Sequence, residues 1–332
     1  MADDHVPFDL IGPWTEAYDG AEKKRLLGQR QPPPFLSHHE RGAQHYQPSR
    51  ELLLAINMAL HTGSPLLLTG EPGTGKTQAA TFVGKYFGIR VFPFVVKSTS
   101  IAQDLLYEFD AVGYLHWAQA AKPESPTLSP EALQEETEAF RRTFLHPGPL
   151  WQAYEEADDA VVLIDEIDKA PRDFPNDLLH ELDQHSFANP LDRNTRIEPK
   201  SGRGPIVIIT SNEERRLPEA FLRRCIWHHI ELTQDLVQAA VESLASASGE
   251  DGGSFPNLGP AELDAARQRF WMIRDLPGID KPPATAELLT WLCILSARRV
   301  RAEELSGGRL RDLPSIEALI KNNDDLKRLE QH

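Results

Sequence analysis

The residues best suited to chemistry lie in a glycine-rich segment at positions 70–78, directly after the apolar run Leu66–Thr69. The segment fits the pattern G-x-x-x-x-G-K-[ST], and its residues are Gly70, Glu71, Pro72, Gly73, Thr74, Gly75, Lys76, Thr77 and Gln78. Glycines let a backbone approach phosphate groups closely, and the N–H groups that open a following helix attract anions. We therefore predict a phosphate-binding loop; a glycine-rich turn before a helix is the simpler alternative.

Lys76 and Thr77 carry the side chains that a bound nucleotide needs. A lysine at this place in the pattern reaches the β- and γ-phosphates, and the hydroxyl that follows it ligates Mg²⁺. A helical pattern runs on from about Lys76 to Phe87. The order of strand, loop and helix strengthens the prediction of a nucleotide site with Mg²⁺. The residues alone do not choose between ATP and GTP.

Acidic residues follow another apolar run, Val161–Ile164. They are Asp165, Glu166 and Asp168. Ligands of open α/β sheets bind at the carboxyl ends of the strands. We expect Asp165 to hold Mg²⁺ through a water molecule and Glu166 to polarise the water that attacks the γ-phosphate. Asp168 is predicted to be structural, as a helix cap or as a partner behind the site. An acid that merely ends a strand at the surface is the alternative.

A third apolar run, Ile206–Thr210, ends in Ser211 and Asn212. Asn212 is a candidate to orient the attacking water from the neighbouring strand, with a surface turn as the alternative. Further on, Arg223 and Arg224 end a short helical pattern. Arginines at a helix end are usually solvated. In a ring assembly the same arginines would face the γ-phosphate of the next subunit.

Five short apolar runs must position these residues. They lack polar alternation and are separated by helical patterns, which predicts an α/β fold with a parallel sheet covered on both faces. The runs are Leu66–Thr69, Val91–Val96, Ala160–Ile164, Ile206–Thr210 and Ile226–Leu232. A helix is also expected from Ser49, its N-cap, with one apolar face formed by Leu52, Leu53, Ile56 and Leu60.

The composition along the chain predicts three parts. Residues 1–48 are rich in proline, glycine and histidine and indicate an N-terminal arm. Residues 49–234 form the α/β nucleotide-binding core, with an insertion at about 98–149 that includes a charged helical stretch over 131–144. Residues 235–332 form a smaller helical domain, with helices expected over 263–273 and 287–300.

The overall composition excludes several classes of protein. The 332 residues include 35 basic and 50 acidic side chains, a net charge of −15, which disfavours nonspecific nucleic-acid binding. Two cysteines, Cys225 and Cys293, allow no disulfide framework and are expected to be packed thiols in a reducing compartment. No run of eighteen apolar residues and no signal peptide is present, so we predict a soluble cytoplasmic protein.

His180 and His185 lie five residues apart, which rules out the H-E-x-x-H zinc motif.

These motifs, in this order, resemble those of an AAA+ ATPase, and most closely the MoxR group of the clade with a helix-2 insert. The resemblance covers roughly residues 45–332 and rests on three segments, at 97–107, 165–179 and 217–224. It implies an AAA+ P-loop core followed by a helical lid. It also implies that Asn212 is sensor 1, that Arg224 is the arginine finger with Arg223 as its neighbour, and that Asp192–Gly204 forms a hairpin.

The resemblance further implies ATP and Mg²⁺ as ligands and a ring, usually of six subunits, with ATP at each interface. MoxR-like proteins act as chaperones on partners with von Willebrand factor A domains, and the insertion is the natural element to contact such a partner. The chain departs from the family at the start of the third lid helix. The place of the sensor-2 arginine found in many members matches Thr285, so this group is either absent or replaced by the nearby Lys281.

Three functions follow from the sequence. The first is an ATPase that couples hydrolysis to remodelling of a partner protein. The second is a nucleotide-gated scaffold or switch with little turnover, in a bacterial stress or conflict system, favoured by the departure at sensor 2 and by the long polar insertion. Glu166 and Arg224 speak against it, since a pure switch needs neither. A nucleic-acid motor is the weakest of the three because of the net charge of −15.

Overall fold

The computed structural model describes Arg25 and residues 46–120, 143–190, 192, 194–246 and 254–331. Nearly all of the predicted N-terminal arm lies outside these residues, as does nearly all of the helix expected over 131–144. The chain divides into two compact units. One contains Glu71–Gln78 and Glu231–His332, and the other contains Pro48–Gly70 and Ala79–Ile230.

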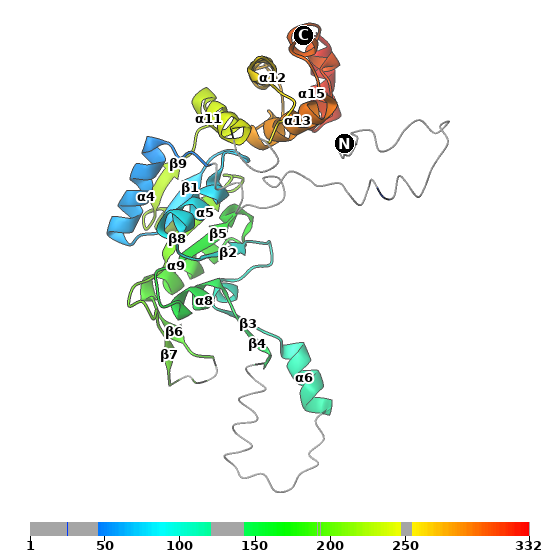
Figure 1. The fold of residues 1–332 in the computed structure, drawn as a ribbon. Coiled ribbons are helices and arrows are strands. Elements are labelled where there is room, and N and C mark those ends of the chain that lie inside the picture. Colours follow the sequence, from blue (N-terminus) through cyan, green and yellow to red (C-terminus); the bar gives the residue numbers. More distant parts are fainter. Residues whose placement is uncertain are drawn as a thin grey trace. The chain divides into compact units, whose positions relative to one another are not determined.

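A five-stranded parallel sheet forms the centre of the second unit, in the order β2-β5-β8-β1-β9 (Figure 1). The strands are β1 (Leu66–Thr69), β2 (Val91–Val95), β5 (Val161–Asp165), β8 (Ile206–Ser211) and β9 (Ile226–His229). The predicted α/β fold and its five strands are thus confirmed. All four residues of β1 are buried, as expected for a strand with both faces covered.

Helices flank this sheet, among them α4 (Arg50–Thr62), α8 (Pro149–Glu155), α9 (Phe174–Gln184) and the short α10 (Glu219–Leu222). The helix predicted to follow the glycine-rich loop is α5, at Lys76–Phe87. The packed side chains of α8, α9, β5 and β8 form one apolar core, which includes Leu150, Tyr154, Val162, Ile164, Leu178 and Ile209. This core holds the strands in their positions, and so it also holds the strand ends at which the candidate site residues lie.

Helix α4 begins as predicted, because the Oγ atom of Ser49 accepts a hydrogen bond from the N–H of Leu52. Its predicted apolar face is partly wrong. Leu52 and Ile56 are buried, but Leu53 is 39% exposed. Successive residues of a helix are about 100° apart, so the face that contains Leu52 continues through Ala55 and Ala59 and leaves Leu53 outside.

The predicted insertion contains a small hairpin of β3 (Tyr107–Phe109) and β4 (Leu145–Pro147), with η1 (Ala102–Leu105) before it and α6 (Ala111–Ala120) after β3. A second hairpin, β6 (Phe187–Ala188) with β7 (Arg196–Ile197), lies earlier than the expected Asp192–Gly204. The N–H of Thr195 donates to the carbonyl of Asp192, so the turn of this hairpin closes before residue 196.

The C-terminal region is helical and has a core of its own. Its helices are α11 (Gln234–Ala245), α12 (Pro260–Arg274), α13 (Thr285–Arg298), α14 (Ala302–Ser306) and α15 (Asn323–Arg328), with 3-10 turns η3 (Leu310–Asp312), η4 (Ile316–Ala318) and η5 (Leu329–Gln331). Leu288, Leu292 and Leu295 are fully buried, because their i, i+4 and i+7 spacing places them on one face of α13. Within the described residues, no helix is both long and apolar enough to cross a membrane.

Candidate functional site

The loop at residues 70–78 follows β1 and precedes α5, and two of its positions require glycine. Gly73 and Gly75 have φ angles of 80° and 90°, a region that favours glycine. A Cβ atom on Gly75 would lie 2.7 Å from Cε2 of Tyr46, and one on Gly73 would lie 3.2 Å from Cβ of Ala284. The loop conformation therefore requires glycine at these two positions. A close approach of the backbone to a phosphate group would require glycine for the same reason.

Inside the loop, polar groups converge on the carbonyl oxygen of Glu71. Nζ of Lys76 donates to this oxygen over 2.7 Å, and Oγ1 of Thr74 donates to it over 2.9 Å. Lys76 and Thr74 are both buried. The loop thus holds the lysine ammonium on its inner side, at the start of α5. A buried cation beside the first N–H groups of a helix suits an anionic phosphate group.

At the carboxyl ends of β5 and β8, one hydroxyl joins two acidic residues. Oγ1 of Thr210 donates to Oδ1 of Asp165 over 2.6 Å and accepts from the N–H of Glu166 over 2.9 Å. Thr210 is only 1% exposed. Glu166 has a φ of 61°, which is unusual for a residue with a side chain. Thr210 thereby fixes both the carboxylate of Asp165 and the strained backbone of Glu166.

Asn212 and Asp168 complete this edge of the sheet. Nδ2 of Asn212 lies 3.5 Å from Oε1 of Glu166. The buried carboxylate of Asp168 accepts the N–H of Asn212 over 3.2 Å and the N–H of Glu214 over 3.1 Å. The predicted structural role of Asp168 is confirmed, because it holds the backbone that carries Asn212.

Lys169 contacts Glu166, which the sequence analysis did not predict. Its Nζ atom lies 2.6 Å from Oε2 of Glu166, and both side chains are partly exposed. The hydrogen bond to Glu166 raises the pKa of the Lys169 ammonium. The i, i+3 spacing of opposite charges was the available signal.

The two candidate arginines lie at the other edge of the sheet. Arg223 caps α10, and Arg224 lies two residues before the first residue of β9. Because all five strands are parallel, this is the amino edge, whereas Asp165 and Glu166 are at the carboxyl edge. A strand as long as β5 spans about 16 Å. Arg224 and Glu166 of one chain are therefore separated by the sheet.

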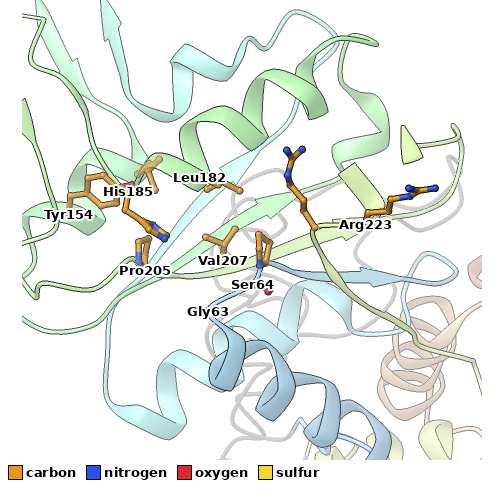
Figure 2. A pocket seen from close by; sticks show the side chains of 11 residues that line it. Gly63, Ser64, Tyr154, Leu182, His185, Pro205, Val207 and Arg223 are labelled. Carbon is orange, nitrogen blue, oxygen red and sulfur yellow. The ribbon is translucent and has the colours of Figure 1, made fainter. Parts of the chain in front are cut away.

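A hollow lies at this amino edge. A pocket of about 340 Å³ is lined by Arg223 and Arg224 together with residues that precede β1 and β8. Figure 2 shows Tyr154, His185 and Pro205 gathered at one end of this pocket and Arg223 at the other. A wider hollow of about 650 Å³ shares His185 and Pro205 with it. The amino edge is thus open where the arginines lie.

The remaining candidates take no part in these networks. Cys225 packs on the core of the sheet and Cys293 on the helical core, which confirms that they are packed thiols. Burial raises the pKa of each to about 12, so both thiols are neutral near pH 7. Thr285 is buried at the start of α13, and Lys281 is exposed. No cluster of three or more His, Cys, Asp or Glu residues suited to a metal ion occurs in the described parts of the chain.

Comparison with known proteins identifies the family of the chain. No curated protein matches the chain. A solved structure described as a "putative ATPase" from Cytophaga hutchinsonii is similar, with 13% identity, 93% of this chain and 87% of that chain covered, and a TM-score of 0.40. A likeness that remote carries no argument about function. The family described as the ATPase family associated with various cellular activities matches residues 66–234, about half of the chain, from the first residue of β1 to just beyond β9. The chain therefore belongs to the AAA family of ATPases.

Proposed function

We propose that the chain hydrolyses ATP at sites shared between neighbouring subunits of a ring. One observation carries this proposal: the acidic network is assembled at the carboxyl edge of the sheet, while Arg224 lies at the amino edge. Within one chain, Arg224 therefore cannot contact a phosphate group that lies beside Glu166. In a ring of identical subunits, the amino edge of one subunit faces a different surface of the next.

The phosphate groups are assigned to the loop from Gly70 to Gln78. The glycine conformations and the buried Lys76 fit an anionic ligand, as described above. Thr77 and Asp165 are the proposed Mg²⁺ ligands, because hydroxyl and carboxylate oxygens suit this ion. An Mg²⁺ ion held by Thr77 and Asp165 would supply positive charge that offsets the negative charge of the phosphate groups.

Glu166 is the proposed general base, since the hydrogen bond from its backbone N–H to Oγ1 of Thr210 holds this residue at the end of β5. Asn212 is the residue proposed to orient the attacking water, and its Nδ2 atom lies 3.5 Å from Oε1 of Glu166. Lys76 of the same chain and Arg224 of the neighbouring subunit are the proposed cations that stabilise the charge on the transferred phosphoryl group. Each chain thus supplies the acidic half of one site and the arginine of another.

The finer identity rests on the resemblance. We propose a MoxR-like ATPase in a hexameric ring that remodels a partner protein with a von Willebrand factor A domain. The insertion at 98–149, which carries the β3–β4 hairpin and α6, is the proposed contact for that partner.

A nucleotide-gated switch with little turnover is the second candidate, and one observation favours it. The carboxylate of Glu166 is engaged by Lys169 at 2.6 Å, and an engaged carboxylate is a poorer base. In that case, hydrolysis starts only when a partner breaks the ion pair.

The rate of ATP hydrolysis per mole of chain, measured over a wide range of protein concentration, tests the proposal. Shared sites predict that specific activity rises with concentration, and Lys76→Ala supplies the background because it removes the phosphate-binding cation. A constant specific activity would show that each chain is complete and would contradict a role for Arg224 in a neighbouring site. Nucleotide binding without hydrolysis at any concentration supports the switch.

A further inference from the structure

Glu71 places a negative charge inside a loop that is proposed to bind a polyanion. Its carboxylate is paired with an arginine from the helical region, since Nη2 of Arg274 lies 2.6 Å from Oε2 of Glu71. Arg274 is the last residue of α12, 203 positions further along the chain, and both residues belong to the same compact unit. The loop is thus in contact with a second cation besides Lys76.

The two partners of this ion pair differ in their access to water. The side chain of Glu71 is 50% exposed, whereas that of Arg274 is 11% exposed. Nη1 of Arg274 donates to the carbonyl of Pro283 over 2.8 Å, and its guanidinium lies 6.0 Å from the ring of Trp271. Water can solvate Glu71 when the pair opens, but the enclosed guanidinium needs another anion in its place.

The segment that anchors Arg274 also touches the phosphate-binding loop. Pro283 accepts the hydrogen bond from Arg274, and the next residue, Ala284, lies 3.2 Å from a Cβ placed on Gly73. The backbone nitrogen of Ala286 lies 3.3 Å from the same point. The N-terminus of α13 therefore abuts the loop, and Arg274 is fixed to the segment that leads into this helix. A fixed guanidinium at the loop is well placed to bind a phosphate through two parallel hydrogen bonds.

We propose that Arg274 binds the terminal phosphate of a nucleoside triphosphate held by the loop, and that Glu71 competes with this phosphate for the guanidinium. This inference rests on the proposed nucleotide site. Under this inference, Arg274 distinguishes a bound triphosphate from a diphosphate. The neighbouring helix α13 begins with Thr285 and has no arginine at that place. Glu71 raises the barrier to that exchange, because its charge opposes an incoming anion.

Opposite effects of two substitutions test this inference. The dissociation constants of MgATP and MgADP are measured by calorimetry for the wild-type chain, Arg274→Ala, Arg274→Lys and Glu71→Gln. Arg274→Ala is expected to weaken ATP binding about 10- to 100-fold, the range for a lost hydrogen bond to a charged group, and ADP binding by less than about threefold. Arg274→Lys gives an intermediate loss, because it keeps the charge without the fork. Glu71→Gln is expected to tighten ATP binding by about two- to fivefold.

Arg309→Ala is the matched control, because it removes an arginine of the same helical region from an exposed ion pair with Asp312. It is expected to leave both constants unchanged, and thermal unfolding of every variant shows that it is folded. Equal weakening of ATP and ADP by Arg274→Ala and by Glu71→Gln would overturn the inference, since the pair would then only brace the loop. Unchanged ATP binding in Arg274→Ala would overturn it too. A wild-type chain that binds neither nucleotide would instead refute the proposed function, and this inference with it.

Discussion

The two edges of the central sheet differ in how deeply their polar side chains are buried. At the carboxyl edge, Asp165, Glu166 and Asp168 each accept or donate hydrogen bonds within the chain, and Thr210 and Asp168 are buried. At the amino edge, Arg223 and Arg224 line an open hollow, and the ion pair of Arg223 with Glu219 is exposed on both sides. One edge is preorganised within a single chain, and the other faces outward.

This difference follows from the topology of the sheet. Parallel strands bring all their carboxyl ends to one edge, so residues that follow β5 and β8 meet without further help. Residues that precede β9 are brought to the opposite edge by the same rule. One copy of this chain therefore cannot bring its own Arg224 next to its own Asp165 and Glu166.

Removal of Arg224 is expected to give the largest effect. Arg224→Ala should lower the rate of ATP hydrolysis by about 10³- to 10⁵-fold, because an arginine supplied by a neighbour stabilises the transition state. The affinity of the dilute chain for ATP should change little, since the arginine lies across the sheet from Glu166. Arg223→Ala is the control, as this exposed neighbour pairs with Glu219. Equal losses in both variants would show that the amino edge matters only as a surface.

Thr210 tests whether the carboxyl edge is preorganised. Thr210→Val keeps the shape of the side chain but removes the hydroxyl that joins Asp165 to Glu166, and we expect a 10- to 100-fold lower rate of hydrolysis. Thr210→Ser keeps the hydroxyl and should retain most of the activity. Equal rates in the valine and serine variants would mean that Asp165 and Glu166 hold their positions without Thr210.

Lys169 should have the smallest effect. Lys169→Ala frees the carboxylate of Glu166, and the rate of hydrolysis should rise by up to about fivefold, since partly exposed ion pairs contribute little free energy. Lys169→Arg keeps the pair and serves as the control. A steady-state assay at saturating ATP measures both variants, and a large fall in the alanine variant would instead make Lys169 part of the machinery.

Much of this arrangement could be predicted from local sequence. The limits of β1 and α5 follow from an apolar run and a glycine-rich loop, and the places of Asp165, Glu166 and Asn212 follow from the strand ends. The exposure of Leu53 was mispredicted because two alanines, weak signals in a sequence, complete the buried face of α4.

The contacts that join distant segments could not be predicted. The role of Thr210 depends on how β8 aligns with β5, and the pairing of Arg274 with Glu71 joins residues 203 positions apart. Neither pattern is periodic or local, and both arise only when the elements pack. Thr210 had one visible signal, a hydroxyl at the end of an otherwise apolar run.

Mixing two inactive variants tests the central claim most directly. Glu166→Gln lacks the base and Arg224→Ala lacks the arginine, so each is expected to hydrolyse ATP at least about 100-fold more slowly than the wild type when assayed alone. In an equal mixture of subunits, about a quarter of the interfaces join an intact Glu166 to an intact Arg224 of the neighbour. The mixture should therefore recover up to about a quarter of the wild-type rate. A mixture as inactive as its two components would contradict the shared site.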